Sequence, residues 1–495
     1  MLRACTETKE LNRQATVGRI SAFRKEEEGT VTIFATFMII MMLMVCGIAV
    51  DLMQNEMMRT RVQNTLDRAI LAASDLDQPL PPDEVVDDYF AKAGMTEFLD
   101  DVQITPGAHL PATNYRIVAA TARTRTPAIY MAMTGTDSLP VYTTGMAEEV
   151  IEKTEISLVL DISGSMRFDD RIGKLRVAAN EFLAAVLDGQ AGTTTSINVI
   201  PYAGQTNPGP IVFNRAGGVQ FADTITVNGE EQPYGGDVTN EYTDDNGDTV
   251  TETSYVSYND RSACLELDSS DFNNIDLPSG GYDQTPHFMN WAIDAPTMDW
   301  GWCPLNNTAI QYAQNNLGNL QAFINTMRLH DGTGTHYGMK YAAALLNPTS
   351  NSTFRALETA NLVPPQFADR PAPFTDTDTR KFIVLMTDGK ITSQLRPKDP
   401  NHELNPTKHL GARSSDRETI SSGSTNINRF YSMCDKAKAQ GIVIYTIAFE
   451  APSAAVTQMR NCATTPAFSY NVQGVEIATA FKSIARQINE LRLTQ

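Results

Sequence analysis

The feature that most constrains this chain is an uninterrupted apolar run near its N-terminus. Residues 30–50 read TVTIFATFMIIMMLMVCGIAV and contain no charged residue. A helix needs roughly 20 residues to cross a bilayer, and a helix in the core of a soluble protein is rarely apolar on every side for that length. A signal peptide has an apolar region of only about 7–15 residues before a small-residue cleavage site. The run therefore predicts a transmembrane helix.

The flanking residues indicate how this helix is oriented and how it continues. The positive-inside rule applies to short segments, while long C-terminal domains are translocated largely regardless of their charge. Residues 1–29 are therefore expected in the cytoplasm. Beyond Val50, apolar residues recur at helical spacing, which predicts an amphipathic stalk to about residue 75. These residues are Met58, Val62, Leu66, Ile70 and Ala73.

Composition limits the partners of the chain. Its 495 residues, 42% of them hydrophobic, are enough for more than one folded unit. The net charge of -19 would repel nucleic-acid phosphates. No basic stripe overrides that charge, so nucleic acid is excluded as an expected partner.

Four cysteines lie beyond the membrane segment and its flanks: Cys264, Cys303, Cys434 and Cys462. No CxxC pair or Cys/His cluster has zinc spacing. In an oxidising compartment the four could form two disulfides. Proximity in sequence favours Cys264–Cys303 and Cys434–Cys462, but four buried free thiols are an open alternative.

Two regions with different sequence patterns follow the stalk. Residues 76–150 contain an acidic helical segment at 83–98 and strand-like segments at 115–123 and 139–148. They predict a small α/β spacer. From residue 154, short apolar runs alternate with amphipathic helices, which predicts a Rossmann-like α/β domain, a parallel-dominated sheet flanked by helices. Its expected strands are 156–161, 196–203, 381–388 and 441–450.

Two long inserts interrupt this pattern, at about 205–318 and 390–425. Asn-Gly turn signals at 227–230 and 245–248 predict hairpins, so the first insert is expected to be β-rich. It also contains all three tryptophans, Trp291, Trp300 and Trp302. They form either a local core for the insert or a recognition surface.

The first predicted strand of the α/β domain ends in a loop rich in oxygen-bearing side chains. Residues 161–166 read DISGSM, at the strand edge where parallel sheets form ligand sites. One carboxylate and two hydroxyls are hard ligands, which suit Mg²⁺, Mn²⁺ or Ca²⁺. The same residue types could instead cap a helix. Two further segments, GTHYG at 334–338 and MTDG at 386–389, favour a metal site.

Together, DISGSM, GTHYG and MTDG resemble the metal-ion-dependent adhesion site of von Willebrand factor A (VWA) domains. The resemblance implies that the hydroxyls of Ser163, Ser165 and Thr335 coordinate Mg²⁺, or alternatively Mn²⁺ or Ca²⁺. Asp161 and Asp388 would supply negative charge, often through bound water. It also implies an open coordination position that accepts an Asp or Glu carboxylate from a partner protein.

The N-terminal region and the end of the chain resemble a second family. Residues 25–74, above all GIAVDLMQNEMMRTRVQNTLDRAILAAS, and the closing INELRLTQ are similar to TadG-like Flp pilus-assembly proteins. Prepilin-type processing would place a Glu five residues after Gly29, where this chain has Phe34. Cleavage as a pilin is therefore not expected.

Other residues near these motifs have more than one interpretation. His336 is a ligand, a proton relay or a structural residue. The basic residues of the second insert either frame an acidic partner or belong to a solvated loop. They are Lys390, Arg396, Lys398, Lys408 and Arg413.

These observations predict a membrane-anchored pilus-assembly or pilus-associated adhesion factor of the Tad/Flp type. One helix would hold it in a bacterial inner membrane, with residues 154–495 in the periplasm as a VWA domain. Its partner would be a pilus or Tad secretion component that offers a carboxylate. The alternatives are a metal-dependent hydrolase and a purely structural membrane tether. An enzyme is not expected, because no general base or catalytic triad is recognisable beside the motif.

Overall fold

The computed structural model describes residues 28–76, 78–106, 115–150, 153–189, 191–243, 249–292 and 297–493. The described residues up to Val150 form one compact unit, and those from residue 153 form a second. The segment predicted as cytoplasmic, apart from residues 28 and 29, lies outside the described residues, and so does the predicted turn at 245–248.

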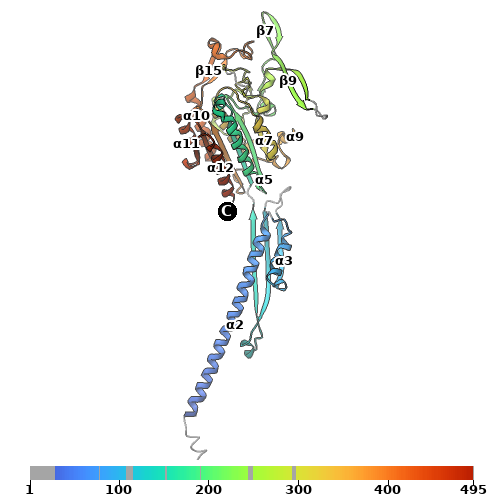
Figure 1. The fold of residues 1–495 in the computed structure, drawn as a ribbon, viewed down its shortest axis with the longest axis vertical. Coiled ribbons are helices and arrows are strands. Elements are labelled where there is room, and N and C mark those ends of the chain that lie inside the picture. Colours follow the sequence, from blue (N-terminus) through green and yellow to red (C-terminus); the bar gives the residue numbers. More distant parts are fainter. Residues whose placement is uncertain are drawn as a thin grey trace, which may run out of the picture. The chain divides into compact units, whose positions relative to one another are not determined.

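One long helix contains the apolar run. Helix α2 (Glu28–Ser74) begins just before the run and continues far beyond it (Figure 1). It is long and apolar enough to cross a membrane. The large apolar side chains of its first half are open to the surroundings; Val31 is 69% and Ile33 72% exposed. A helix in a soluble core would have them covered, whereas lipid would cover them here.

The second half of α2 packs against the rest of the first unit. Val62, Leu66, Ile70 and Ala73 are buried against helix α3 (Pro82–Lys92) and a three-stranded antiparallel sheet. The sheet order is β1 (Leu99–Pro106), β2 (Tyr115–Pro127) and β3 (Ser138–Val150). The acidic helix predicted over 83–98 ends at Lys92, because Gly94 has a φ of 68° and stops it.

The core of the second unit is a six-stranded sheet. Its order is β12 (Gln311–Gln314), β5 (Thr195–Tyr202), β4 (Lys153–Asp161), β13 (Thr379–Thr387), β16 (Val443–Phe449) and β17 (Ser469–Val472). All neighbours are parallel except β12, which is antiparallel to β5. The four central strands are the four that the sequence predicts. Every residue of β5 is buried, as expected for a strand covered on both faces.

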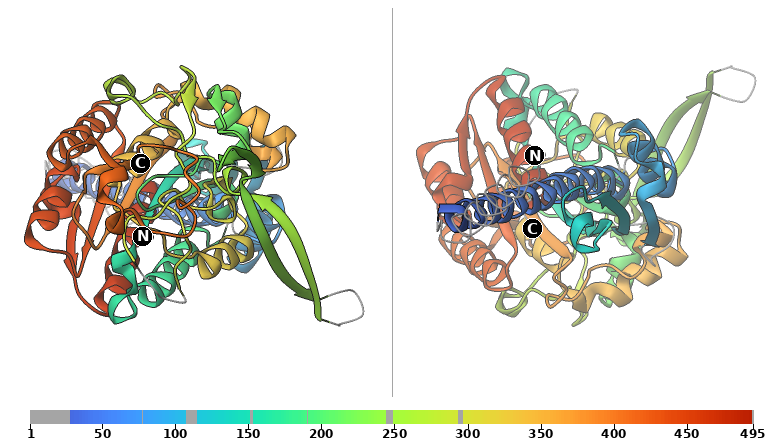
Figure 2. Two further views of the ribbon diagram at one scale, coloured as in Figure 1. Left: turned by 90° about the horizontal axis from the view of Figure 1, so that it is seen from above. Right: turned by 90° about the horizontal axis from the view of Figure 1, so that it is seen from below.

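Helices cover both faces of this sheet (Figure 2). One face carries α4 (Arg171–Val186), α7 (Leu317–Thr326) and α12 (Glu476–Leu493). The other carries α8 (Thr335–Ala344), α9 (Asn351–Thr359), α10 (Gly423–Ala439) and α11 (Ser453–Cys462). The fold is therefore the predicted VWA-like α/β class. The chain moves outward from β4 on one side and from β13 on the other, so the topological switch point lies between these two strands.

Small two-stranded sheets occupy the insert regions. Their elements are β6 (Gly218–Val219), β7 (Thr224–Val227), β8 (Glu230–Pro233), β9 (Gly235–Thr243), β10 (Thr249–Ser257), β11 (Tyr282–Asp283), β14 (Gln394–Pro397) and β15 (Arg417–Ser421). Two short helices, α5 (Ala191–Thr194) and α6 (Gly209–Arg215), flank β5. Asn228 and Gly229, with φ of 53° and 87°, form the predicted turn between β7 and β8. Strand β12 lies inside the region predicted as the first insert.

The two insert regions pack on each other. The indole N–H of Trp302 donates to Gln394 Oε1 at 3.0 Å, and that of Trp300 donates to the Asn405 carbonyl at 3.0 Å. Trp302 is 2% exposed and Trp291 60% exposed, so the first is a core residue and the second lies on the surface. The local-core interpretation is thus correct for Trp302, and a recognition role for Trp291 stays a prediction.

The solvated-loop interpretation of the second insert is wrong for two of its basic residues. Arg396 is buried and forms an ion pair with Glu266. Arg413 is also buried and donates to Asn405 Oδ1 at 2.8 Å. Each guanidinium has partners because an unpaired buried cation would be costly.

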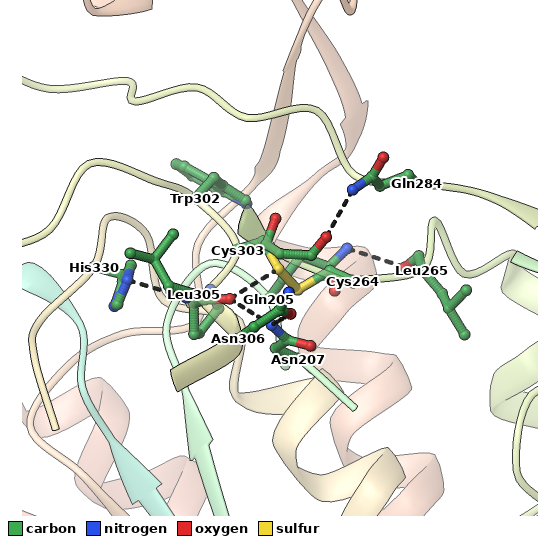
Figure 3. The surroundings of a disulfide bond; sticks show 12 residues. Gln205, Asn207, Cys264, Leu265, Gln284, Trp302, Cys303, Leu305, Asn306 and His330 are labelled. Atoms are coloured by element: carbon green, nitrogen blue, oxygen red, sulfur yellow. Dashed lines mark hydrogen bonds between the residues drawn. A yellow bond between two sulfur atoms is a disulfide. The ribbon is translucent and has the colours of Figure 1, made fainter. Parts of the chain in front are cut away.

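Both disulfides favoured by sequence proximity are confirmed. Cys264–Cys303 and Cys434–Cys462 have Cα–Cα distances of 5.9 and 5.3 Å. The first joins two segments of the insert beside His330, whose Nε2 accepts the Leu305 N–H at 3.3 Å (Figure 3). The His330 N–H in turn donates to the Ile162 carbonyl at 2.9 Å, so this disulfide supports the backbone next to the DISGSM loop.

Candidate metal centre

Four of the five predicted site residues meet at one edge of the sheet. Asp161 ends β4 and Asp388 follows β13, and the two strands are parallel neighbours. The Ser165 hydroxyl donates to Asp388 Oδ1 at 2.6 Å and lies 3.1 Å from Ser163 Oγ. The Ser163 N–H donates to Asp161 Oδ1 at 2.8 Å. The switch point therefore gathers two carboxylates and two hydroxyls.

Thr335 lies at the same edge without a direct bond to the other four. It is the first residue of α8, and the Gly334 N–H donates to the Ala203 carbonyl at 2.6 Å. Beside Ala203, the Tyr202 hydroxyl donates to Asp161 Oδ2 at 3.1 Å. Among the described residues, the buried Thr335 hydroxyl has no hydrogen-bond partner of normal geometry, and the Tyr202 hydroxyl lies near it. A buried hydroxyl normally has one, so this oxygen is suited to a ligand.

The two carboxylates are buried close together. Burial and the nearby charge of Asp388 raise the pKa of Asp161 to about 7. Burial also raises the pKa of Asp388, against the hydrogen bonds from Ser165 and Arg171. Low dielectric makes two neighbouring negative charges costly. A cation between them would relieve that cost.

One cation of the chain already contacts Asp388. Arg171, the first residue of α4, donates from Nη1 to Asp388 Oδ2 and from Nε to Glu450 Oε2, both at 2.8 Å. Glu450 follows β16, the next strand of the sheet. Thr387 Oγ1 also donates a hydrogen bond to the site, to Asp161 Oδ2 at 2.7 Å.

The hydroxyls are not used as helix caps. Ser163 precedes the short 3₁₀ segment η3 (Gly164–Asp170), and its side chain makes no capping hydrogen bond. Gly334, which precedes α8, has no side chain to cap with. The capping alternative therefore does not explain the motif.

The donor set fits a hard divalent cation and not a soft one. In the described part of the chain, no group of three or more His, Cys, Asp or Glu side chains is placed to hold a metal. The site depends on hydroxyl oxygens and two carboxylates, which are ligands typical of Mg²⁺, Mn²⁺ and Ca²⁺.

A cleft of about 520 Å³ opens beside Ser165. Phe168 and Trp291, which are 50% and 60% exposed, are among its lining residues. Asp331 fixes the Trp291 segment, because its Oδ2 accepts the N–H groups of Asn290 and Trp291 at 2.6 and 3.0 Å. Exposed aromatic side chains thus lie beside the cleft that Ser165 borders.

His336 lies in the core instead of at the metal site. Its ring packs against Phe272 and Tyr337, with centroid distances of 5.6 and 4.1 Å. Burial and the charges of Arg429 and Arg396 hold its pKa well below the usual value. The structure therefore favours the structural interpretation of this histidine.

The sequence interpretation missed several residues of this centre. Glu450 had a usable signal, since it ends a predicted parallel strand as Asp161 does. Tyr202 also lies at the end of a predicted strand. Arg171 had no signal, because nothing in its local sequence shows that it faces Asp388.

Comparison with known proteins identifies the N-terminal region. Residues 29–75 match the family described as "Putative Flp pilus-assembly TadE/G-like". This part of the chain is TadE/G-like, and it contains most of helix α2. No curated protein matches the chain significantly.

Solved structures similar to the chain include VWA domains of pilus proteins. The vWF domain of the type V pili tip protein Mfa5 from Porphyromonas gingivalis is 14% identical, with 69% of this chain and 97% of that chain covered and a TM-score of 0.34. The adhesive tip pilin GBS104 from Group B Streptococcus agalactiae is 11% identical, with 68% of this chain and 100% of that chain covered and a TM-score of 0.33. Proximal thread matrix protein 1 from the mussel byssus, solved with a zinc-occupied MIDAS motif, is 9% identical. The match covers 68% of this chain and 46% of that chain, with a TM-score of 0.28. Because these scores are low, the VWA-like class rests on the strand order of this chain and the position of its loops.

Proposed function

We propose that this protein is a pilus-assembly or pilus-associated adhesion factor of the Tad/Flp type. It would bind a partner protein through a divalent cation in the centre built by DISGSM, Thr335 and Asp388. The observation that carries the proposal is the meeting of the Ser163 and Ser165 hydroxyls with Asp161 and Asp388 at the switch point. The TadE/G-like N-terminal region supports the pathway.

Each residue would have a defined part in binding. The hydroxyls of Ser163, Ser165 and Thr335 would hold Mg²⁺, or Mn²⁺ or Ca²⁺, while Asp161 and Asp388 would supply negative charge. A bound cation with mostly neutral ligands supplies an electrophilic site for an Asp or Glu carboxylate of the partner. Phe168 and Trp291 would then contact residues next to that carboxylate, because both border the cleft.

The helix and the disulfides support the proposed location. Helix α2 would span a bacterial inner membrane, with the second unit in the periplasm. Two disulfides in the second unit fit an oxidising compartment. A pilus or secretion component in the same compartment is then an accessible partner.

Metal binding is tested by melting the detergent-solubilised full-length protein with and without Mg²⁺, Mn²⁺ and Ca²⁺. At a metal concentration about 100-fold above Kd, the cation should stabilise the folded state by about 2.7 kcal/mol. Ser163→Ala should abolish this shift. The matched control is Ser415→Ala, which removes an exposed hydroxyl far from the motif in sequence. Equal shifts in both variants would contradict the ligand assignment.

Partner binding is tested with purified pilus and Tad secretion components. Binding should require metal, should be lost in EDTA and should be lost in Ser163→Ala but not in Ser415→Ala. A metal-induced increase in melting temperature without any metal-dependent partner would instead favour the structural tether.

A further inference from the structure

The tip of the β2–β3 hairpin, residues 128–137, is attached to the membrane helix. Three consecutive N–H groups of the tip, from Ile129, Tyr130 and Met131, donate to the Asp51 carboxylate at 3.2, 2.8 and 2.7 Å. One turn earlier on α2, Gly47 lies under the Tyr130 ring. A Cβ at Gly47 would be 2.4 Å from Tyr130 Cγ, so only glycine permits this close contact.

The contacts along the hairpin show which of its ends faces the bilayer. Gly145, on β3, packs against the Ile70 side chain of α2. Nearer the tip, Thr126 Oγ1 donates to Asn55 Oδ1 at 3.0 Å. The tip itself reaches Asp51 and Gly47. The hairpin therefore runs along α2 toward the apolar half of the helix (Figure 1). Its tip is the end of the hairpin nearest the apolar run.

Along the axis of α2, the tip lies level with the end of the apolar run. An α-helix rises about 1.5 Å per residue, so a hydrocarbon core of about 30 Å takes up roughly 20 residues. When residue 30 lies at one boundary, the other lies near Val50. Gly47 and Asp51 are on either side of that boundary, and the tip is attached to both.

The surface of the tip is apolar and exposed. Ile129 is 65%, Tyr130 43% and Met133 74% exposed. From Pro127 to Thr136 the sequence PAIYMAMTGT contains no charge, and Asp137 is the one charged residue of the tip. Tyrosine with apolar neighbours is typical of the membrane–water interface, where one end of the ring is wet and the other is not.

We propose that this tip is a second membrane contact. Ile129, Tyr130 and Met133 would insert into the interface of the bilayer that α2 spans, on the side of the second unit. Asp51 would be the positioning residue, since it fixes the tip at this height by three hydrogen bonds. Two points of contact would hold the first unit in one orientation on the membrane, which a single helix cannot do.

The test is depth-dependent quenching of an introduced tryptophan in the full-length protein in lipid nanodiscs. The native tryptophans, at positions 291, 300 and 302, all lie in the second unit and provide a constant background. Met133→Trp places a probe at the tip. Met146→Trp is the matched control, because Met146 is 69% exposed on the same hairpin next to Gly145, far from the tip.

The expected result is that the added emission of Met133→Trp shifts to the blue and is mostly lost in nanodiscs of brominated lipid. The added emission of Met146→Trp should be the same in brominated and ordinary lipid. Adding Asp51→Ala to Met133→Trp should restore much of the emission, because the tip is released from the helix. Ile129→Trp provides a second tip probe with an independent effect on folding.

Two outcomes would overturn the proposal. Tip probes that are not quenched by brominated lipid would show that the tip is outside the bilayer. A blue shift that depends on protein concentration, without quenching, would show that a second copy of the chain covers the tip. Neither readout depends on metal or partner binding.

Discussion

Replacing Arg171 by leucine should destabilise the second unit, and a divalent cation should reduce the effect. In the metal-free protein, Arg171 neutralises Asp388, whose side chain is 0% exposed. Removal of one partner of a buried ion pair costs about 3–5 kcal/mol. Arg171 is 16% exposed and Asp388 keeps its hydrogen bond from Ser165, so the lower value of about 3 kcal/mol applies here. For a large domain this corresponds to a decrease in Tm of about 6 °C.

The informative measurement is the difference between two metal-induced shifts. Wild-type protein and Arg171→Leu are melted with EDTA and with saturating Mg²⁺. Mg²⁺ should raise the Tm of the variant more than that of the wild type, because the guanidinium no longer shares Asp388 with the cation. Lys174→Leu is the control, since Lys174 contacts Glu450 at 3.4 Å and not Asp388. Equal Mg²⁺ shifts in wild type and Arg171→Leu would refute the idea that one carboxylate serves both cations.

Three further results are expected. Mg²⁺ affinity, measured by titration calorimetry, should fall by about tenfold per pH unit below pH 7, because burial and Asp388 raise the pKa of Asp161 to about 7 and binding must displace its proton. Burial lowers the pKa of His287 to about 3. The stability that its neutral ring contributes is therefore complete above the unfolded pKa of about 6.5 and is lost as the pH falls. The free energy of unfolding should fall by about 3 kcal/mol between pH 6.5 and 4, and by less in His287→Gln. Replacing both Cys264 and Cys303 by alanine should cost up to about 4 kcal/mol, because their bridge closes a long loop, and chemical denaturation of the second unit measures this loss.

The sheet could be predicted where its strands are buried. Strands β4, β5, β13 and β16 are nearly continuous apolar runs, because helices cover both of their faces. The edge strands β12 and β17 read QYAQ and SYNV and have no such run. Edge strands are short and partly solvated, so local sequence does not mark them. This is why the sequence predicts an insert where β12 lies.

The site could be predicted only in part, for a similar reason. Residues that follow buried strands or form recognisable short motifs, such as Asp161 and Asp388, are visible in the sequence. Arg171 and the cleft beside Ser165 depend on which helix and which insert pack there. The packing of the inserts on each other, through Trp302 and Gln394, also joins segments too distant in sequence for any local pattern to reveal.

The pairing of β3 with β2 has a mechanical consequence. The two strands pair over their whole length, from Tyr115 opposite Val150 to Pro127 opposite Ser138. The chain leaves this sheet at Val150, beside the end of α2, where the Leu76 N–H donates to Glu149 at 2.6 Å. Tension applied to the chain beyond Val150, directed away from the bilayer, would act along β3 and load these hydrogen bonds in shear, all at once. The β2–β3 pairing would therefore resist such a force through all of its hydrogen bonds together.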